Sequence, residues 1–358
     1  MDQRAGSGGV HFRLHVGSSL KVPENEFRNE GRMNISVAIG TYNRASMVRQ
    51  AVEEALAQSL SPGEVVVADD ASTDQTSEVL ASLAASDSRV RVIRQPANMG
   101  VANWNSAIAA TRGELIAWCS DDDRFLPDHL RASVEYLERH PEVGLVHSGF
   151  TDAVETGTGC LLEERRLRSA GPLRVDRGNL FAYLTRYYDW PFHPSTIVMR
   201  REVWEQTGPF DPAYALADTD WFVRAAERFP VVMLPRHGVL NRRHPGNWSN
   251  RVGSARMQAE IFEIVDRAML RRWPKASPAR WFWRALWRAN VRLRLLLTIR
   301  ARIRGGHREA AGAAWEALTE GTGARPWDWL SRLGAALIRR SAARAEVRVE
   351  ARQSVSPL

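Results

Sequence analysis

Apolar runs and helical patterns alternate along the chain from residue 34 to residue 150. Short runs rich in Val and Ile predict buried strands, and the stretches between them repeat apolar residues at helical spacing. The predicted strands are ISVAIG, EVVVADDAS, RVRVIRQ, GELIAWC and VGLVHSGF, and the predicted helices cover residues 45–58, 76–85, 101–111 and 127–140. Alternating strands and helices indicate βαβ units. We therefore expect an α/β fold with a Rossmann-like, mostly parallel sheet flanked by helices.

Three of the predicted strands end in polar clusters. TYNR (41–44) follows the first strand, DDAS (69–72) ends the second, and SDDD (120–123) follows the fourth. Ligands of open parallel sheets bind beyond the carboxyl ends of the strands. Each cluster alone is equally well explained as a turn held by Asp, Asn or Ser side chains. Three such clusters together favour one ligand-binding crevice.

The cluster after the fourth strand places Asp121, Asp122 and Asp123 next to one another. Crowded carboxylates are made tolerable by protonation, by Arg or Lys, or by a metal cation. A hard divalent ion is often held by one or two carboxylates, with substrate phosphates completing its shell. Such an ion would neutralise a diphosphate leaving group. The cluster therefore predicts a metal–diphosphate site, and the alternative is a solvated acidic turn before the helix near Pro127.

Five segments occur in the order that is typical of family 2 glycosyltransferases with the GT-A fold. They are ISVAIGTYNRASMVRQAVEEALAQS, EVVVADDASTDQT, NMGVANWNSAIAATRGELIAWCSDDDRFLPDHL, HPSTIVMRREVWEQTGPFD and ADTDWFVRAA. Over residues 35–250 the chain resembles this family, most closely the bacterial members similar to the spore-coat glycosyltransferase. The resemblance implies a GT-A fold, a nucleoside-diphosphate sugar donor, a saccharide or lipid-linked acceptor, and Mg²⁺ or Mn²⁺ as cofactor.

The resemblance also implies a role for each donor-side residue that matches the family motifs. Tyr42 would stack on the nucleotide base, beside Gly40 and Thr41, as aromatic side chains do with any base. Arg44 would donate charge-assisted hydrogen bonds to the diphosphate. Asp70 would accept a hydrogen bond from the imide N–H of uracil or thymine. We therefore expect a UDP- or dTDP-sugar donor.

The three aspartates receive different expectations from the same resemblance. Asp121 would hold the ribose or the metal shell, Asp122 would coordinate the ion, and Asp123 would lie behind the site or at the surface. Ser120 stands where many relatives have the first aspartate of the motif, which removes one potential ligand. Trp104 stands where many relatives have Arg, so donor contacts from that helix do not carry over.

An inverting transfer needs a carboxylate that removes the proton of the acceptor hydroxyl. The family has Glu-Asp at the start of a helix, and here Ala217 replaces the Glu while Asp218 matches the Asp. We expect Asp218 to be the base, and the alternative is a carboxylate that only caps the helix. Asp220 is expected to be structural, paired with Arg224 one turn later.

Two further segments match the acceptor side and the loop after the core. GPFD (208–211) resembles the acceptor-side loop, and His193 lies in a strand-like segment that we expect to line the nucleotide-sugar site. In RRHPGNWSN (242–250), His244 would meet the metal and Arg243 a phosphate, and the loop would close over the donor. The alternatives are an ordinary buried histidine and an ordinary surface loop.

The last part of the chain has a different composition. Of the 358 residues, those from Glu260 onward include 20 Lys and Arg against 9 Asp and Glu, and seven of the 13 tryptophans. We expect a polar, disordered extension over 1–32, a GT-A domain over 33–255 and a basic helical region over 256–358. Whether Met33 is the true start is left open.

Residues 280–304 form an amphipathic pattern with an arginine at every fourth position from Arg280 to Arg292. Arg with Trp suits an anionic membrane surface, and residues 327–340 repeat the pattern. The alternative is a helical subdomain that packs on the core. No apolar segment is long enough to span a membrane. We expect a cytoplasmic enzyme held on the inner face of the cell membrane, and no nucleic-acid partner despite the basic charge.

Together these features predict a metal-dependent, inverting glycosyltransferase that acts in cell-surface polysaccharide or glycolipid synthesis. One alternative is a non-catalytic protein on the same fold that binds a nucleotide sugar or serves as a scaffold. A nucleotidyltransferase is a second alternative, but TYNRAS is not a Gly-rich, Lys-bearing phosphate loop. The two cysteines, Cys119 and Cys160, provide neither a disulfide framework nor metal-ligand spacing.

Overall fold

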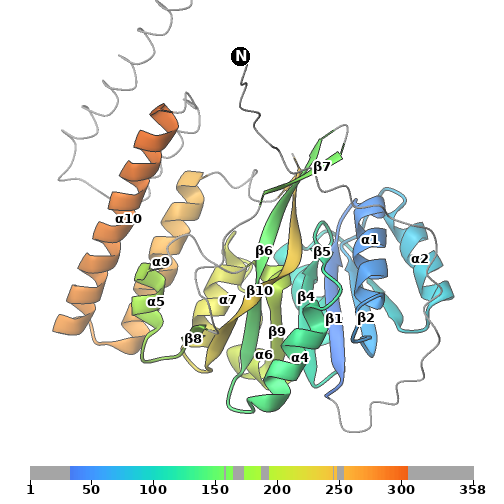
Figure 1. The fold of residues 1–358 in the computed structure, drawn as a ribbon, viewed down its shortest axis with the longest axis horizontal. Coiled ribbons are helices and arrows are strands. Elements are labelled where there is room, and N and C mark those ends of the chain that lie inside the picture. Colours follow the sequence, from blue (N-terminus) through green and yellow to red (C-terminus); the bar gives the residue numbers. More distant parts are fainter. Residues whose placement is uncertain are drawn as a thin grey trace, which may run out of the picture. The chain divides into compact units, whose positions relative to one another are not determined.

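A ten-stranded mixed sheet forms the centre of the fold of the described residues (Figure 1). The computed structural model describes residues 33–156, 159–163, 173–186, 193–244, 246–247 and 254–304. All of these lie in one of the two units into which the chain divides, residues 33–358. The expected extension over 1–32 and the second amphipathic pattern over 327–340 therefore lie outside the described residues.

The strand order is β3-β2-β1-β4-β9-β6-β10-β5, with β7 beside β6 and β8 beside β10. β3, β2, β1 and β4 are parallel, β9 runs against both of its neighbours, and β6 and β10 are again parallel. The strands are β1 (Ile35–Thr41), β2 (Glu64–Asp69), β3 (Val90–Arg94), β4 (Leu115–Ser120), β5 (Arg124–Phe125), β6 (Leu145–Thr156), β7 (Gly159–Glu163), β8 (Leu173–Val175), β9 (Ile197–Arg200) and β10 (Val231–Arg243).

The sequence predictions for the first half of the sheet are confirmed. The five predicted strands are β1, β2, β3, β4 and β6, and the four predicted helices are α1 to α4 with ends shifted by a few residues. Pro127 lies just before the last of them instead of inside its first turn. The helices are α1 (Ala45–Leu56), α2 (Thr76–Ser86), α3 (Val101–Ala109), α4 (His129–Arg139), α5 (Leu180–Arg186), α6 (Arg201–Thr207), α7 (Ala217–Ala226), α9 (Ser254–Arg272) and α10 (Pro278–Arg304), with a 3₁₀ turn η1 (Pro194–Thr196).

The longest strand, β10, is absent from the predicted elements. Its sequence VVMLPRHGVLNRR contains Pro235 and Gly238, which normally weaken a strand assignment. The register against β6 shifts on both sides of His237, so the strand accommodates these residues through irregularities. β10 matters because it carries Arg242 and Arg243 to the edge where the polar clusters lie.

Alternate residues of the central strands pack into two hydrophobic cores, one on each face of the sheet, as the period of a strand requires. In β1, Val37 and Ile39 join the core under α1, α2 and α4, while Ala38 joins the core under α3, α6 and α7. The sheet is therefore covered by helices on both faces, which leaves its edge at the carboxyl ends of the parallel strands for ligands.

The helices after residue 254 share the core of the preceding residues. α9 contacts α7, and α10 contacts both α9 and α5. Trp287 of α10 is 3% exposed and meets the ring of Phe262 of α9 edge-on, with ring centroids 4.7 Å apart. Arg284 and Arg288 both pair with Asp266, at 2.8 and 3.1 Å. Part of the predicted basic face thus packs on the core, and the boundary near residue 255 stays a prediction.

Another face of α10 is exposed and apolar. Trp281 is 75% exposed and Phe282 53% exposed, and Leu286, Leu293 and Leu296 are also exposed. No helix among the described residues is long and apolar enough to cross a membrane.

Candidate active site

The polar ends of β1, β2 and β4 meet at one edge of the sheet. The Thr41 hydroxyl donates a 2.8 Å hydrogen bond to Asp121, which joins the first cluster to the third. The Asn43 N–H donates to the Ser72 hydroxyl at 2.9 Å, which joins the first to the second. Asn43 adopts a left-handed conformation with φ of 51°, which Asn tolerates better than most residues, and its side chain accepts the Thr73 N–H at 2.7 Å. The three predicted clusters therefore form one site.

Arg44 is the cation that makes the adjacent aspartates tolerable. Its Nη1 atom lies 2.7 Å from Oδ1 of Asp121 and 2.8 Å from Oδ2 of Asp122. Burial raises the pKa of Asp121 to about 6, although the nearby Arg44 charge opposes this rise. The carboxylates are thus bridged by a guanidinium that comes from the loop after the first strand.

Described residues just after β10 contact Asp122 and Arg44. Nε2 of His244 lies 3.0 Å from Oδ2 of Asp122, and the Asn247 amide donates to that oxygen at 3.2 Å. Nη2 of Arg44 donates to the Gly246 carbonyl at 3.0 Å. His244 and Asp122, expected as metal ligands, are therefore neighbours.

The donor set at this point fits Mg²⁺ or Mn²⁺. Carboxylate oxygens suit both ions, and an imidazole is compatible with Mn²⁺. Within the described ranges, no three His, Cys, Asp or Glu residues are grouped so as to hold an ion by themselves. Asp122 and His244 would therefore need phosphate oxygens of a ligand to complete the coordination, which is the usual arrangement for Mg²⁺ at nucleotides.

Asp123 is buried and contacts other partners than Asp121 and Asp122 do. Of the two positions expected for it, the one at the surface is therefore wrong. It accepts a hydrogen bond of 2.5 Å from the Ser195 hydroxyl and one of 3.3 Å from the Arg242 N–H. Nδ1 of His193 lies 3.2 Å from its Oδ2 atom, without the angles of a hydrogen bond. Burial, and then the charge of Asp122, raise the pKa of Asp123 to about 8. Sequence reasoning missed Ser195, although a hydroxyl two residues after His193 was a usable signal.

His193 begins a 3₁₀ turn instead of lying within a strand. Its N–H donates to the Thr196 hydroxyl at 3.3 Å, and that hydroxyl donates to the His193 carbonyl at 2.6 Å. Burial lowers the pKa of His193 to about 4, while the charges of Asp122 and Asp218 oppose this. The imidazole is thus neutral near pH 7 and lies in the electrostatic field of both proposed functional carboxylates.

Asp218 lies in the first turn of α7, as the sequence predicts. Its Oδ1 atom accepts the Thr219 N–H at 2.8 Å. Burial raises the pKa of Asp218, and the neighbouring His193 opposes this rise. Asp220 pairs with Arg224 at 2.7 Å, which agrees with its expected structural role. A carboxylate with a raised pKa at the site is suited to accepting a proton.

The residues expected to bind the base differ in exposure. Tyr42 is 41% exposed, so its ring is accessible for stacking. Asp70 is buried and accepts the N–H groups of Met99 and Gly100 at 2.6 and 2.8 Å, so each of its oxygens already has one donor. A Cβ added at Gly40 would lie 3.0 Å from the Trp104 ring. Gly40 therefore makes room for the tryptophan that departs from the family pattern.

Arg243 is held by Asp152, with Nε donating to Oδ1 at 3.1 Å. The structure thus places it beside His244 at the end of β10, but with its charge already paired. A phosphate contact from Arg243 would have to compete with Asp152.

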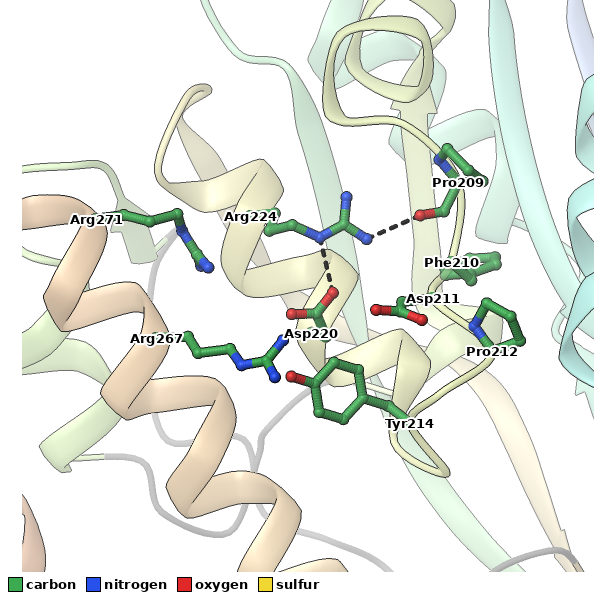
Figure 2. Close-up of a pocket in the computed structure, with 9 residues that line it drawn as sticks. All are labelled: Pro209, Phe210, Asp211, Pro212, Tyr214, Asp220, Arg224, Arg267 and Arg271. Atoms are coloured by element: carbon green, nitrogen blue, oxygen red, sulfur yellow. Dashed lines mark hydrogen bonds and ion pairs between the residues drawn. The ribbon is translucent and has the colours of Figure 1, made fainter.

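A hollow of about 380 Å³ lies beside the GPFD loop, between α7 and α9 (Figure 2). Arg224 spans from Asp220 to the Pro209 carbonyl, which it reaches at 2.8 Å, and so holds the loop against α7. Arg267 of α9 lies over the Tyr214 ring, 5.4 Å from its centroid. The hollow therefore places polar groups from two helices beside the segment expected to face the acceptor.

Residues 36–205 match the model of glycosyl transferase family 2. Over this segment, which is slightly less than half of its length, the chain is similar to family 2 glycosyltransferases. An uncharacterized protein of Mycobacterium tuberculosis is 32% identical over 225 residues, which cover 60% of this chain and 60% of the relative. An uncharacterized glycosyltransferase of Nostoc is 32% identical over 183 residues, which cover 50% of this chain and 55% of the relative. The chain thus spans little more than half the length of these relatives.

Solved glycosyltransferases have the same fold as this chain. Staphylococcus aureus TarS 1–349 in complex with UDP-GlcNAc superposes with a TM-score of 0.55, at 15% identity, over 81% of this chain and 83% of that one. The mannosyltransferase PcManGT from Pyrobaculum calidifontis, in complex with GDP-Man and Mn²⁺, gives 0.51 at 20% identity over 89% and 84%. At these identities the likeness establishes the GT-A fold alone.

Proposed function

We propose that the chain is an inverting, metal-dependent glycosyltransferase that moves a sugar from a nucleoside diphosphate to a hydroxyl. The observation that carries this proposal is the convergence of Arg44, Asp121, Asp122 and His244 at the carboxyl edge of the sheet. The match of residues 36–205 to the family 2 model supports the reaction class.

The diphosphate would bind where Arg44, Asp122 and His244 meet. Asp122 and His244 would hold Mg²⁺ or Mn²⁺, and Asp121 would complete the shell or hold the ribose. When bound, the ion would neutralise charge on the departing diphosphate. Arg44 and Arg243 would add charge-assisted hydrogen bonds to the phosphate oxygens.

The nucleoside would bind at the rim formed by the ends of β1 and β2. Tyr42 would stack on the base beside Gly40 and Thr41, and the exposed ring supports this role. Asp70 would accept the imide N–H of uracil or thymine with a remaining lone pair. We therefore propose a UDP- or dTDP-sugar, and the TarS complex with UDP-GlcNAc supports the uridine form.

The acceptor hydroxyl would be activated by Asp218. The hydroxyl attacks the anomeric carbon opposite the leaving diphosphate, and its proton passes to the Asp218 carboxylate, so the configuration inverts. His193, whose pKa is influenced by the charges of both Asp122 and Asp218, would line the site of the donor sugar. The alternative function, nucleotide-sugar binding without catalysis, predicts binding but no transfer and no effect of Asp218 on any measured rate.

The experiment that tests the donor site is calorimetric titration of the full chain with UDP, dTDP, GDP and CDP, with and without Mn²⁺. Wild type should bind UDP or dTDP with Mn²⁺, and Asp122→Ala should lose this binding. Asp128→Ala, which removes a half-exposed carboxylate of the α4 N-terminus, is the matched control and should bind normally. If folded wild type binds none of the diphosphates, the proposed function is wrong.

We also propose that the enzyme works at the inner face of the cell membrane, on a saccharide or lipid-linked acceptor of a cell-surface polysaccharide or glycolipid. The exposed apolar residues of α10, in a helix without an acidic residue, support this location. The wild type should sediment with vesicles that contain phosphatidylglycerol, and Phe282→Glu should stay in the supernatant. Val92→Glu, an equivalent change at an exposed apolar residue of β3, is the control. Equal sedimentation of both variants would contradict membrane attachment through α10.

A further inference from the structure

Arg44 bridges three partners that belong to different parts of the site. One guanidinium nitrogen lies 2.7 Å from Asp121 and 2.8 Å from Asp122, and the other donates to the Gly246 carbonyl at 3.0 Å. The Asp122 oxygen that receives Arg44 also lies 3.0 Å from His244. Oδ2 of Asp122 therefore contacts both the Arg44 guanidinium and His244, the residue expected to bind a metal ion together with Asp122.

We propose that Arg44 makes tight binding of the divalent cation depend on the nucleoside diphosphate. The guanidinium competes with the cation for Asp121 and Asp122, and the diphosphate relieves this competition by taking the guanidinium as its own partner. This inference rests on the proposed function, because it assigns the diphosphate to the same site.

Charge balance is the first reason for this coupling. The two buried carboxylates carry two negative charges, and Arg44 already neutralises one of them. A divalent cation added beside Arg44 would leave a net positive charge in a partly buried site, where like charges repel strongly. The negative charges of a diphosphate reverse this balance, so the cation and Arg44 can then both remain.

The geometry of the guanidinium is the second reason. Arg presents several donors in a planar fork that matches carboxylate and phosphate oxygens equally well. The Arg44 side chain is 24% exposed, so it reaches the surface of the site and not a closed core. Moving to a phosphate would also release the Gly246 carbonyl.

The test measures the affinity of the full chain for Mn²⁺ alone and for UDP with Mn²⁺. If Arg44 formed only a structural ion pair, its replacement would not change these two affinities in opposite directions. Mn²⁺ binding without nucleotide is followed by electron paramagnetic resonance, and UDP binding in saturating Mn²⁺ by calorimetry. Arg44→Gln should bind Mn²⁺ alone about tenfold more tightly than wild type, and UDP with Mn²⁺ about tenfold more weakly, as expected for one charged hydrogen-bonded contact. Arg44→Lys keeps the charge but not the fork, and should lie between them.

Arg91→Gln is the matched control, because Arg91 forms a similarly short ion pair with Glu64, at 2.6 Å, away from the aspartates. It should leave both affinities unchanged. Thermal melts give an independent measure, since Mn²⁺ alone should raise the melting temperature of Arg44→Gln more than that of wild type. They also report whether the variant folds, and Arg44→Lys carries the test if it does not.

The outcomes separate this inference from the proposed function. Equal or weaker Mn²⁺ binding by a folded Arg44→Gln overturns the competition, even if UDP binding falls. Wild type that binds no nucleoside diphosphate overturns the proposed function, and with it the role assigned to the diphosphate. Opposite shifts of the two affinities support the coupling.

Discussion

The Ser195 hydroxyl donates a hydrogen bond of 2.5 Å to the buried carboxylate of Asp123, and so ties η1 to the loop after β4. The same hydroxyl accepts the Ser120 N–H at 2.9 Å. The third aspartate of the SDDD cluster therefore differs from the first two. It fastens η1 to the sheet, while Asp121 and Asp122 face Arg44.

Replacing Ser195 by Ala should destabilise the protein more than it alters ligand binding. The change removes the hydroxyl donor to a buried carboxylate and the acceptor of a backbone N–H, which costs about 1–3 kcal/mol. Urea unfolding at pH 7.5 measures the difference. Ser86→Ala removes a hydroxyl that donates only to the Leu83 carbonyl on the same helix, and should cost much less. Equal stabilities of the two variants would contradict this role of Ser195.

Replacing Asp218 by Asn should abolish turnover and leave donor binding intact. Asn keeps the size of the side chain and can still accept the Thr219 N–H, but it cannot take up a proton from the acceptor. General bases contribute about 10²- to 10⁴-fold to a rate, so kcat should fall by that order. The measurement is sugar transfer or donor hydrolysis, with calorimetric UDP binding beside it. A variant with wild-type kcat would show that Asp218 only caps the helix.

Acidification should destabilise the protein through two buried histidines. Burial, and then the charge of Arg236, lower the pKa of His129 to about 3, and burial lowers that of His147 to about 4. Their unfolded pKa is near 6.5. Below that value the unfolded chain binds protons that the folded protein excludes, so stability is full above pH 6.5 and falls as the pH drops.

The matched variant for this pH effect is His129→Asn. Each histidine should cost about 2 kcal/mol at pH 5 relative to neutral pH. Asp123, whose pKa is raised, acts with the opposite sign, so the comparison between wild type and variant is more informative than either curve alone. Urea unfolding at pH 7.5 and 5 should show a smaller loss in the variant. An equal loss in both proteins would mean that His129 is not excluded from protonation.

The parts of the fold that the sequence predicted share one property, which is local periodicity. β1 to β4 and α1 to α4 each carry their own apolar pattern, and the polar residues after the strands indicated the edge where Arg44 meets Asp121. β10 was missed because Pro235 and Gly238 interrupt it, and its pairing with β6 depends on residues far away in the chain. Long-range partners such as Ser195 for Asp123 have no local signal of comparable strength.

In the site, too, local motifs were predicted from the sequence, whereas long-range partners were not. Motif matching brought Arg44, Asp122 and His244 to one place, but it assigned Arg44 to a phosphate, and the structure pairs it with the carboxylates themselves. Arg243 likewise has Asp152 as its partner. Which partner an arginine takes depends on competing charges a few ångströms apart, and these are fixed only by the folded chain.

Two tryptophans of α10 distinguish packing from surface exposure within one helix. Trp287 is 3% exposed against Phe262, whereas Trp281 is 75% exposed. Trp287→Ala should lower the free energy of unfolding by about 3–5 kcal/mol, as large-to-small changes in a core do. Trp281→Ala should change it by no more than about 0.5 kcal/mol. Urea unfolding of both variants measures this contrast.

The contrast also bears on what the C-terminal helices do. If Trp287→Ala is as mild as Trp281→Ala, α10 does not pack on α9 and is held to the domain only weakly. If it is severe, Trp287 belongs to the core, on the side of α10 where Arg284 and Arg288 pair with Asp266. The apolar residues left for a membrane surface are then those on the exposed face, which includes Phe282. Vesicle binding should in that case respond to Phe282→Glu, while stability responds to Trp287→Ala.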